Sequence, residues 1–429
     1  MGKAKRVRAE RGRPPGAAAA PGTSNRRLQL AAVAALVIVL ALAAALAVVL
    51  LQRHGGGTAS AGTHSTSESL PLGARLDRCG ALAGDEAMRT CYSAALKGLV
   101  DPTKDPRPVV QRIADHAWAQ PQRPLLGICH GLMHTVGREY AHAHGLKLTT
   151  LMDYLPKSND PGCSAGFAHG LVTGVAGQID PTRPRAMAAL CDKAGTRYRR
   201  YSCIHGFGHA FMRVYAEQVG PALRLCRALG KVEDSDCAQG VFHDYWFSVH
   251  GIDSTKAASP RPVTDPRQLC GAQAADFVRP CWYRAFVDSR PTGFQTASRT
   301  DDERLCAGLA GLQREACLTA ASVIGPPDPA AQLEVCSAFR GRDAVSCIHG
   351  TKVQNLLGSS TATFVGVIRN CDRFPSATKR ACYFWLGKTI SVVTDGGFRR
   401  DGCPLLARAA RDACVAGAKS MNGPLVTFS

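Results

Sequence analysis

The cysteines of this chain occur in pairs with a fixed spacing. Six pairs have ten residues between the two cysteines, and two pairs have eleven. Along one helix that spacing would separate the Cα atoms by about 16 Å, beyond the roughly 7 Å that a disulfide bridges. Each pair is therefore predicted to join the end of one helix to the start of the next, across a short loop. The predicted pairs are Cys79 with Cys91, Cys191 with Cys203, Cys226 with Cys237, Cys270 with Cys281, Cys306 with Cys317, Cys336 with Cys347, Cys371 with Cys382, and Cys403 with Cys414.

Helical patterns fill the stretches between these cysteines. Segments such as 210–215 and 221–226 place apolar side chains at helical spacing, and no sustained Val/Ile/Thr alternation indicates strands. Aromatic residues make up 6% of the chain, so each hairpin has a modest core and gains from a covalent link. We predict an all-α fold of disulfide-stapled helical-hairpin repeats, an α-solenoid, over residues 76–429. In architecture it resembles the cysteine-rich members of the Sel1-like and tetratricopeptide helical repeats, whose consensus residues are not found here.

Cys129 and Cys163 fall outside the pairing pattern. Each stands where the second cysteine of a pair is expected, yet neither has a first cysteine upstream. One interpretation is that they pair with each other between adjacent repeats. The other is that they remain two thiols near a group of histidines, available as metal ligands or redox groups. An oxidising compartment favours the disulfide, and the sequence leaves both interpretations open.

A second pattern, in register with the cysteines, marks four consecutive repeats over residues 125–250. Each repeat carries a glycine followed three residues later by a histidine, and successive glycines are 35, 40 and 34 residues apart. The first and third copies have a further histidine directly before the glycine, so the motif alternates like a duplicated two-repeat unit. The histidines are His130, His134, His169, His205, His209 and His243.

The repeat itself does not require these histidines. Six residues after the second cysteine, the remaining repeats have lysine, valine or serine. The glycine does recur, at Gly350 and Gly417, and glycine inside a helix costs about 1 kcal/mol relative to alanine. We therefore interpret the glycine as a point of close helix contact. His349 precedes Gly350 without a second histidine behind it, and we interpret it as a decayed copy that binds no metal.

Imidazole is a common metal ligand, and histidines four residues apart share one face of a helix. The pattern predicts a transition-metal site of copper, zinc or iron. His130, His134 and His169 would form one set of ligands, and His205, His209 and His243 its duplicate. In a tightly wound solenoid the two sets would face each other as a dinuclear site. The alternative is a structural or pH-sensing polar network. The neighbouring residues available to orient the ligands or act as general bases are Glu139, Tyr140, His142, Asp244 and Tyr245. For each of them the alternative is favoured, because a charged or aromatic residue on a helix face is usually solvated or packed.

The N-terminal part predicts a membrane anchor. Residues 1–27 carry eight basic side chains and one acidic side chain, in a Pro- and Ala-rich composition typical of a disordered tail. Residues 30–51 contain no polar side chain and would form a helix of about 33 Å, so we predict a signal-anchor over 28–52. A cleaved signal peptide is the alternative. The excess of basic residues before the span places the N-terminus in the cytoplasm. A Gly/Ser/Thr-rich linker over 53–75 follows.

These features predict a single-pass protein of the cell membrane whose repeat domain lies outside the cytoplasm, where its 18 cysteines form disulfides. The formal net charge is +19, and the basic tail indicates topology and lipid contact, not nucleic-acid binding. Motifs for nucleotides, serine hydrolases, zincins and c-type haem are absent from the sequence. Two function classes remain. One is a membrane-anchored extracytoplasmic metalloprotein, with oxidase or hydrolase as candidate activities. The other is a non-catalytic scaffold that binds a protein or an anionic cell-envelope partner.

Overall fold

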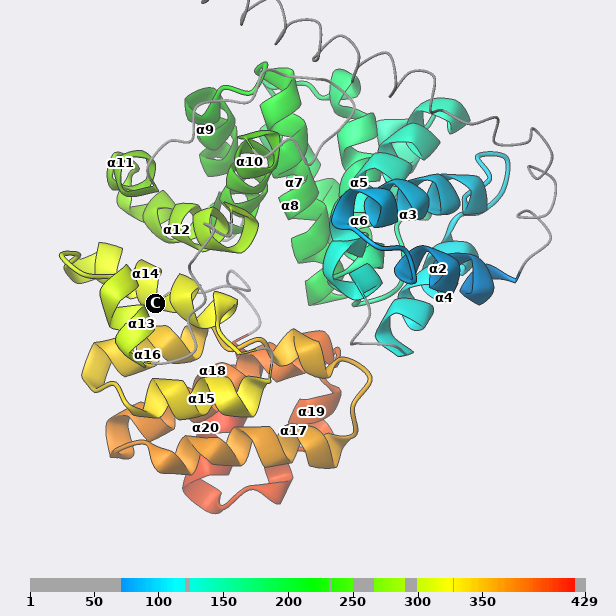
Figure 1. Cartoon of the computed structure of the whole chain (residues 1–429). Helices are drawn as coiled ribbons and strands as arrows, with labels where there is room; N and C mark the ends of the chain where they lie inside the picture. Colours follow the sequence, from blue (N-terminus) through cyan, green and yellow to red (C-terminus); the bar gives the residue numbers. More distant parts are fainter. Residues whose placement is uncertain are drawn as a thin grey trace, which may run out of the picture. The chain divides into compact units, whose positions relative to one another are not determined.

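The computed structural model describes residues 71–119, 124–230, 234–249, 266–289, 299–326 and 328–420. In these ranges all regular secondary structure is helical, as predicted, and helices follow one another as hairpins along the chain (Figure 1). The α-helices are α2 (Leu72–Gly80), α3 (Asp85–Leu99), α4 (Arg107–Ala119), α5 (Pro124–His144), α6 (Cys163–Gly174), α7 (Pro184–Cys191), α8 (Arg197–Val214), α9 (Val219–Leu229), α10 (Asp234–Val249), α11 (Pro266–Gly271), α12 (Ala275–Ser289), α13 (Arg299–Leu305), α14 (Gly311–Ile324), α15 (Pro329–Ser337), α16 (Gly341–His349), α17 (Thr361–Ile368), α18 (Ser376–Val393), α19 (Gly397–Asp401) and α20 (Arg408–Lys419). The 3-10 helices are η1 (Leu148–Asp153), η2 (Ala176–Gln178), η3 (Asp192–Ala194), η4 (Val353–Leu356), η5 (Arg369–Arg373) and η6 (Cys403–Leu405).

The predicted tail (1–27), the predicted membrane-spanning segment (28–52) and most of the predicted linker (53–75) lie outside the described residues. The predicted end of the linker is about one helical turn too late, because α2 begins at Leu72. Leu72 packs against the core and Leu76 is fully buried, so this helix already belongs to the repeat domain. Among the helices that the structure describes, none has the length and apolar character needed to cross a membrane.

Nine disulfides link neighbouring helices, and the Cα atoms of each pair lie 5.0–5.8 Å apart. Eight of them join the cysteines that the spacing predicts. These eight disulfides are formed by Cys79 and Cys91, Cys191 and Cys203, Cys226 and Cys237, Cys270 and Cys281, Cys306 and Cys317, Cys336 and Cys347, Cys371 and Cys382, and Cys403 and Cys414.

The sequence predicts that the second cysteine of each pair stands at the start of its helix. This detail of the prediction was wrong, because the cysteine lies further into the helix. Cys203 is the seventh residue of α8, and Cys91, Cys281, Cys317, Cys347, Cys382 and Cys414 are likewise the seventh residues of their helices. Cys237 is the fourth residue of α10. The reason is that the second helix runs back along the first for up to nearly two turns before the disulfide joins them.

The ninth disulfide joins Cys129 to Cys163. From the sequence, these two cysteines could form either a disulfide or two free thiols. In the structure they form the disulfide. It connects the first half of α5 to the first residue of α6. Because His130 follows Cys129 directly, this link also holds the first histidine beside α6.

Helices of successive repeats pack on one another in chain order. α5 packs on α6, α6 on α8 and α8 on α10, and the series continues through α12, α14, α16, α18 and α20. α18 also contacts α8. Close to this contact, Asn159 donates a hydrogen bond to the carbonyl of Val393 (3.4 Å), and Tyr198 packs against Val392. The C-terminal repeats therefore support α8, which carries two of the histidines.

Candidate metal centre

The six histidines of the repeated motif meet inside a group of four helices, α5, α6, α8 and α10. α5 and α8 contribute two each, four residues apart, and α6 and α10 contribute one each. The ring centroids of neighbouring imidazoles lie 4.6–5.5 Å apart. His169, His205, His209 and His243 are at most 2% exposed. His130 and His134, on α5, are partly buried.

Glycines set the distance between these helices. A Cβ atom at Gly166 of α6 would lie 2.1 Å from the carbonyl oxygen of His130, and one at Gly240 of α10 would lie 1.9 Å from that of His205. Only glycine fits such contacts, so each histidine-bearing turn touches the backbone of the next helix and the imidazoles can meet. Gly417 makes the same contact with Phe384, at 1.9 Å, in the last hairpin. The glycine contact therefore belongs to the repeat, and the histidines are an addition to it.

Replacing Gly240 with alanine is expected to separate α8 from α10 and lower the free energy of unfolding by about 3 kcal/mol, the upper part of the range for overpacking. The added Cβ meets backbone, which cannot rotate away. Gly366→Ala is the matched control, because Gly366 is also helical and a Cβ there meets nothing within 4 Å. That control should gain up to about 1 kcal/mol. Denaturant unfolding of both variants measures the difference, and equal effects would contradict this account of the glycine.

Pairs of imidazole nitrogens approach one another within the cluster. His134 Nε2 lies 3.1 Å from His130 Nε2 and 3.2 Å from His169 Nδ1. His205 Nε2 lies 3.1 Å from His243 Nδ1. The metal site predicted from the sequence requires that imidazole nitrogens of two ligands of one ion lie close together. The nitrogens of His134 and His169 are indeed within about 4 Å, as two bonds of about 2.1 Å to one ion require.

The opposite nitrogen of three rings meets a fixed polar group. His130 Nδ1 lies 2.8 Å from the carbonyl oxygen of Pro161, His169 Nε2 lies 3.0 Å from Ser202 Oγ, and His209 Nδ1 lies 3.3 Å from Asp244 Oδ1. A carbonyl only accepts, so Nδ1 of His130 carries the proton and Nε2 presents a lone pair to the cluster. Partners of this kind orient metal-binding imidazoles and set their tautomer.

Burial keeps the cluster uncharged at neutral pH. Removal from water is the largest effect on every ring, and it lowers the pKa of His130 to about 4 and those of His134, His169, His205 and His243 well below the ordinary value. The pKa of His209 is also lowered, although its contact with Asp244 acts in the opposite direction. Neutral imidazoles with available lone pairs are the form that binds metal ions.

The two ligand sets proposed from the sequence are not separate in the structure. Three triads have ligand atoms within 4.8 Å of one another. One is the predicted set of His205, His209 and His243, whereas the other two combine histidines from both predicted sets. The physical reason is the packing of α5, α6, α8 and α10, which points both duplicated halves at the same interior space. The triads are His130 with His134 and His243, His134 with His169 and His209, and His205 with His209 and His243.

Of the neighbouring residues available to assist the ligands, Asp244 contacts the cluster, through His209. Glu139 instead forms an exposed ion pair with Lys97, at 2.7 Å. Tyr140 donates a hydrogen bond to the carbonyl of Lys104, at 2.9 Å, and His142 is exposed. Tyr245 is buried against Trp246. These four residues are thus solvated or packed, as the favoured alternative for them stated, because nearness in sequence does not give the direction of a side chain around a helix.

His349 lies apart from the six histidines, packed against Trp385 with ring centroids 4.3 Å apart. Burial lowers its pKa to about 3. Among the described residues, every metal-compatible triad is drawn from the same six histidines. This placement agrees with the interpretation of His349 as a copy that is not a ligand.

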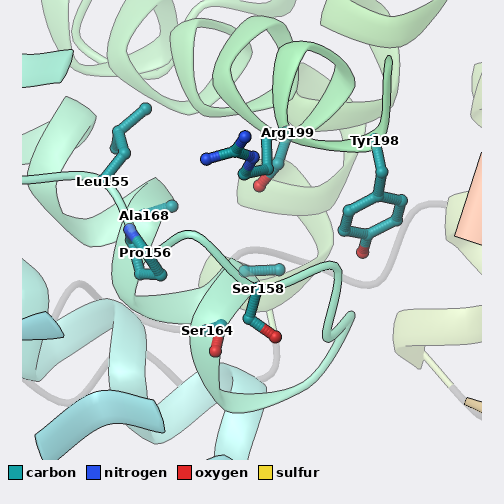
Figure 2. A pocket seen from close by; sticks show the side chains of 9 residues that line it. Leu155, Pro156, Ser158, Ser164, Ala168, Tyr198 and Arg199 are labelled. Carbon is teal, nitrogen blue, oxygen red and sulfur yellow. The ribbon is translucent and has the colours of Figure 1, made fainter. Parts of the chain in front are cut away.

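Two groups beside the cluster, Ser202 and Arg284, were not predicted from the sequence. Ser202 hydrogen-bonds His169 and also lines a small pocket with room for about one water molecule. Figure 2 shows Tyr198 and Arg199 facing the loop of Pro156 and Ser158 across this pocket. Arg284, from α12, is buried, and its positive charge is among the causes that lower the pKa of His130, His205 and His243. Ser202 lies three residues before His205, which was a usable signal, whereas nothing in the local sequence marked Arg284.

Comparisons of the chain with protein-family models, with curated proteins and with solved structures found no match. In its described residues the structure is all-helical and disulfide-rich, with a buried histidine cluster that could hold a metal ion.

Proposed function

We propose that this chain is a membrane-anchored, extracytoplasmic α-solenoid whose six-histidine cluster binds a transition metal. One observation carries the proposal: six neutral imidazoles from four helices, four of them fully buried, turn nitrogen atoms toward a common interior. The ligands are His130, His134, His169, His205, His209 and His243. Copper, zinc and iron are the candidate ions, because imidazole suits all three.

A purely structural hydrogen-bond network accounts less well for these nitrogens. His130 Nε2 presents a lone pair, and His134 Nε2 can donate its single proton either to it or to His169 Nδ1. His209 Nε2 is buried and has no hydrogen-bond partner among the described residues. A buried polar atom left unpaired costs about 1–3 kcal/mol. A bound ion would engage such nitrogens together, which favours metal binding over the pH-sensing alternative.

The disulfides and the N-terminal sequence support a cellular location for the protein. Nine disulfides favour an oxidising, extracytoplasmic compartment for the repeat domain. The apolar segment 30–51 and the basic tail before it support a single-pass membrane anchor with a cytoplasmic N-terminus.

A non-catalytic scaffold is the second candidate, and the repeats after α10 favour it. They retain the disulfides and, at Gly350 and Gly417, the glycine contacts. Among their described residues no metal-compatible triad occurs. These repeats would then present a surface to a protein or an anionic cell-envelope partner while the histidine repeats bind metal. An oxidase or hydrolase activity would in addition require an open coordination position on the ion.

Metal analysis of the full-length protein, purified in detergent without chelators, tests the proposal. We expect a bound transition metal that chelation removes and that returns on titration. A protein that neither contains nor takes up any such ion would refute the metal site and leave the scaffold. The topology is tested separately with reporters fused at Ser429, where a reporter active only in the cytoplasm would contradict the predicted orientation.

A further inference from the structure

We infer that the cluster holds one Zn²⁺ ion at a time, through the three imidazoles of His205, His209 and His243. We call these three residues the α8–α10 triad. This inference rests on the proposed metal-binding function and specifies which of the six histidines hold the ion. It differs from the two occupied sets, and from the dinuclear site, that the repeat pattern suggests.

The three metal-compatible triads exclude one another. Any two of them share one histidine, which is His134, His209 or His243. A neutral imidazole has a single lone pair, because its other nitrogen carries the proton, and it therefore binds one ion. Two ions with three imidazoles each would need two complete triads at once. The predicted set of His130, His134 and His169 is not among the triads of the described residues, so it does not supply the second site.

The α8–α10 triad is the most deeply buried of the three. Its members, His205, His209 and His243, are each at most 2% exposed. Both other triads include His134, which is only partly buried. Burial excludes the water that would otherwise compete with the imidazoles for the ion. An ion that can choose among the triads should therefore settle in this one.

Two ring nitrogens of this triad are available to an ion. Among the six histidines, the buried ring nitrogens without a hydrogen-bond partner in the described part of the chain are His205 Nδ1 and His209 Nε2. Asp244 Oδ1 accepts the proton of His209 Nδ1 at 3.3 Å, so His209 Nε2 carries a lone pair. An ion in this triad engages that unused lone pair. An ion bound to His134 and His169 would instead replace their hydrogen bond of 3.2 Å.

A single pair of packed helices supplies all three ligands. His205 and His209 lie one turn apart on α8, and His243 lies on α10. A Cβ atom at Gly208 of α8 would lie 2.1 Å from a backbone oxygen of α10, and Gly240 of α10 makes the reciprocal contact with α8. Backbone contacts on both sides fix the spacing of the two helices, so the ligands are already held together. The other triads draw on α5 with α10, or on α5, α6 and α8.

The ligand set favours zinc. Three imidazoles with a fourth position open to water are a coordination that Zn²⁺ adopts in proteins. Cu²⁺ prefers tetragonal geometry, and calcium and magnesium prefer oxygen. No fourth His, Cys, Asp or Glu ligand joins the triad among the described residues. Asp244, next to His209, adds a buried negative charge that offsets part of the charge of the ion.

Titration of the metal-free, full-length protein in detergent tests this inference, with Zn²⁺, Cu²⁺ and anaerobic Fe²⁺ in separate arms. We expect one tightly bound equivalent of Zn²⁺, and X-ray absorption showing three imidazoles and one oxygen ligand. Two tight equivalents, or more than three imidazoles on the zinc, would overturn the inference while leaving metal binding in place. Binding of Cu²⁺ or Fe²⁺ without binding of Zn²⁺ would do the same. Absence of binding in every arm would refute the metal-binding function itself.

Single substitutions can remove the triads one at a time. Each triad has one histidine that it shares with neither of the others, namely His130, His169 and His205. The three alanine variants are therefore matched controls for one another. We expect His205→Ala to weaken Zn²⁺ binding by at least about 100-fold, and the other two variants to stay within about threefold of the unmodified protein. A 100-fold loss in either of those two, or equal affinity in all three, would overturn the choice of the α8–α10 triad.

The double variant His130→Ala/His169→Ala gives the positive test. It leaves the α8–α10 triad as the one complete triad of the described residues. We expect it to retain one equivalent of Zn²⁺ with three imidazole ligands, and loss of that equivalent from a folded double variant would overturn the inference. Circular dichroism checks the fold of every variant. If His205→Ala fails to fold, this retention and the stoichiometry of the unmodified chain still decide the question.

Discussion

Replacement of His209 by alanine is expected to weaken metal binding by at least about 100-fold while the helical fold persists. His209 belongs to two of the three triads, and its Nε2 is buried without a partner among the described residues. Even loss of a group that only orients a ligand costs 10- to 100-fold in metal affinity, so loss of a ligand should cost more. Competition with a chelator of known affinity measures the change.

The fold should survive this change because the other repeats form with valine, lysine or serine at the equivalent position. Circular dichroism and non-reducing peptide mapping, with the nine disulfides intact, check this expectation. His349→Ala is a suitable control, since it also removes a buried imidazole but one that packs on Trp385 away from the cluster. Equal metal affinity of the His209 variant and the unmodified protein would remove this histidine from the site.

Acid should destabilise the metal-free protein steeply. Burial holds the pKa values of all six imidazoles below the ordinary value near 6.5. The unfolded chain therefore binds protons at a pH where the folded chain does not. This contribution to stability is fully present above pH 6.5 and is lost as the pH falls from there toward the lowered values.

The expected size of the effect follows from the number of rings. Each imidazole that titrates only in the unfolded state removes about 1.4 kcal/mol per pH unit, so the five with the largest shifts approach about 7 kcal/mol per unit. A domain stable by about 5–15 kcal/mol should then lose the packing of α5, α6, α8 and α10 between pH 6.5 and 5. Denaturant midpoints at pH 7.5, 6 and 5 measure this loss. A midpoint that stays constant over that range would show that the cluster is not buried and neutral.

Sequence patterns were sufficient for the local architecture. A spacing of ten or eleven residues between cysteines excludes a single helix and requires a turn, so eight disulfides and the succession of helical hairpins were predictable. The cluster members were also predictable, because His130, His134, His169, His205, His209 and His243 repeat in register where the remaining repeats have other residues. The disulfide pairing and the membership of the histidine cluster both follow from the spacing of residues along the sequence.

Tertiary packing decided how these parts combine. The choice between a disulfide of Cys129 with Cys163 and two thiols depended on how α6 starts beside α5. The meeting of the two predicted ligand sets in one cluster depended on glycine contacts such as those of Gly166 and Gly240, which bring neighbouring helices together. Ser202 and Arg284 became neighbours of the histidines for the same reason.

The sequence by itself therefore determined the helices, eight of the disulfides and the identity of the clustered histidines. Periodicity controls which residues share a helix face, and spacing controls which cysteines a turn brings together. Only the tertiary structure determined that the six imidazoles form one cluster and which groups orient them. Angles between packed helices and the directions of side chains across them arise from contacts between segments far apart in sequence. A local sequence pattern does not predict those contacts.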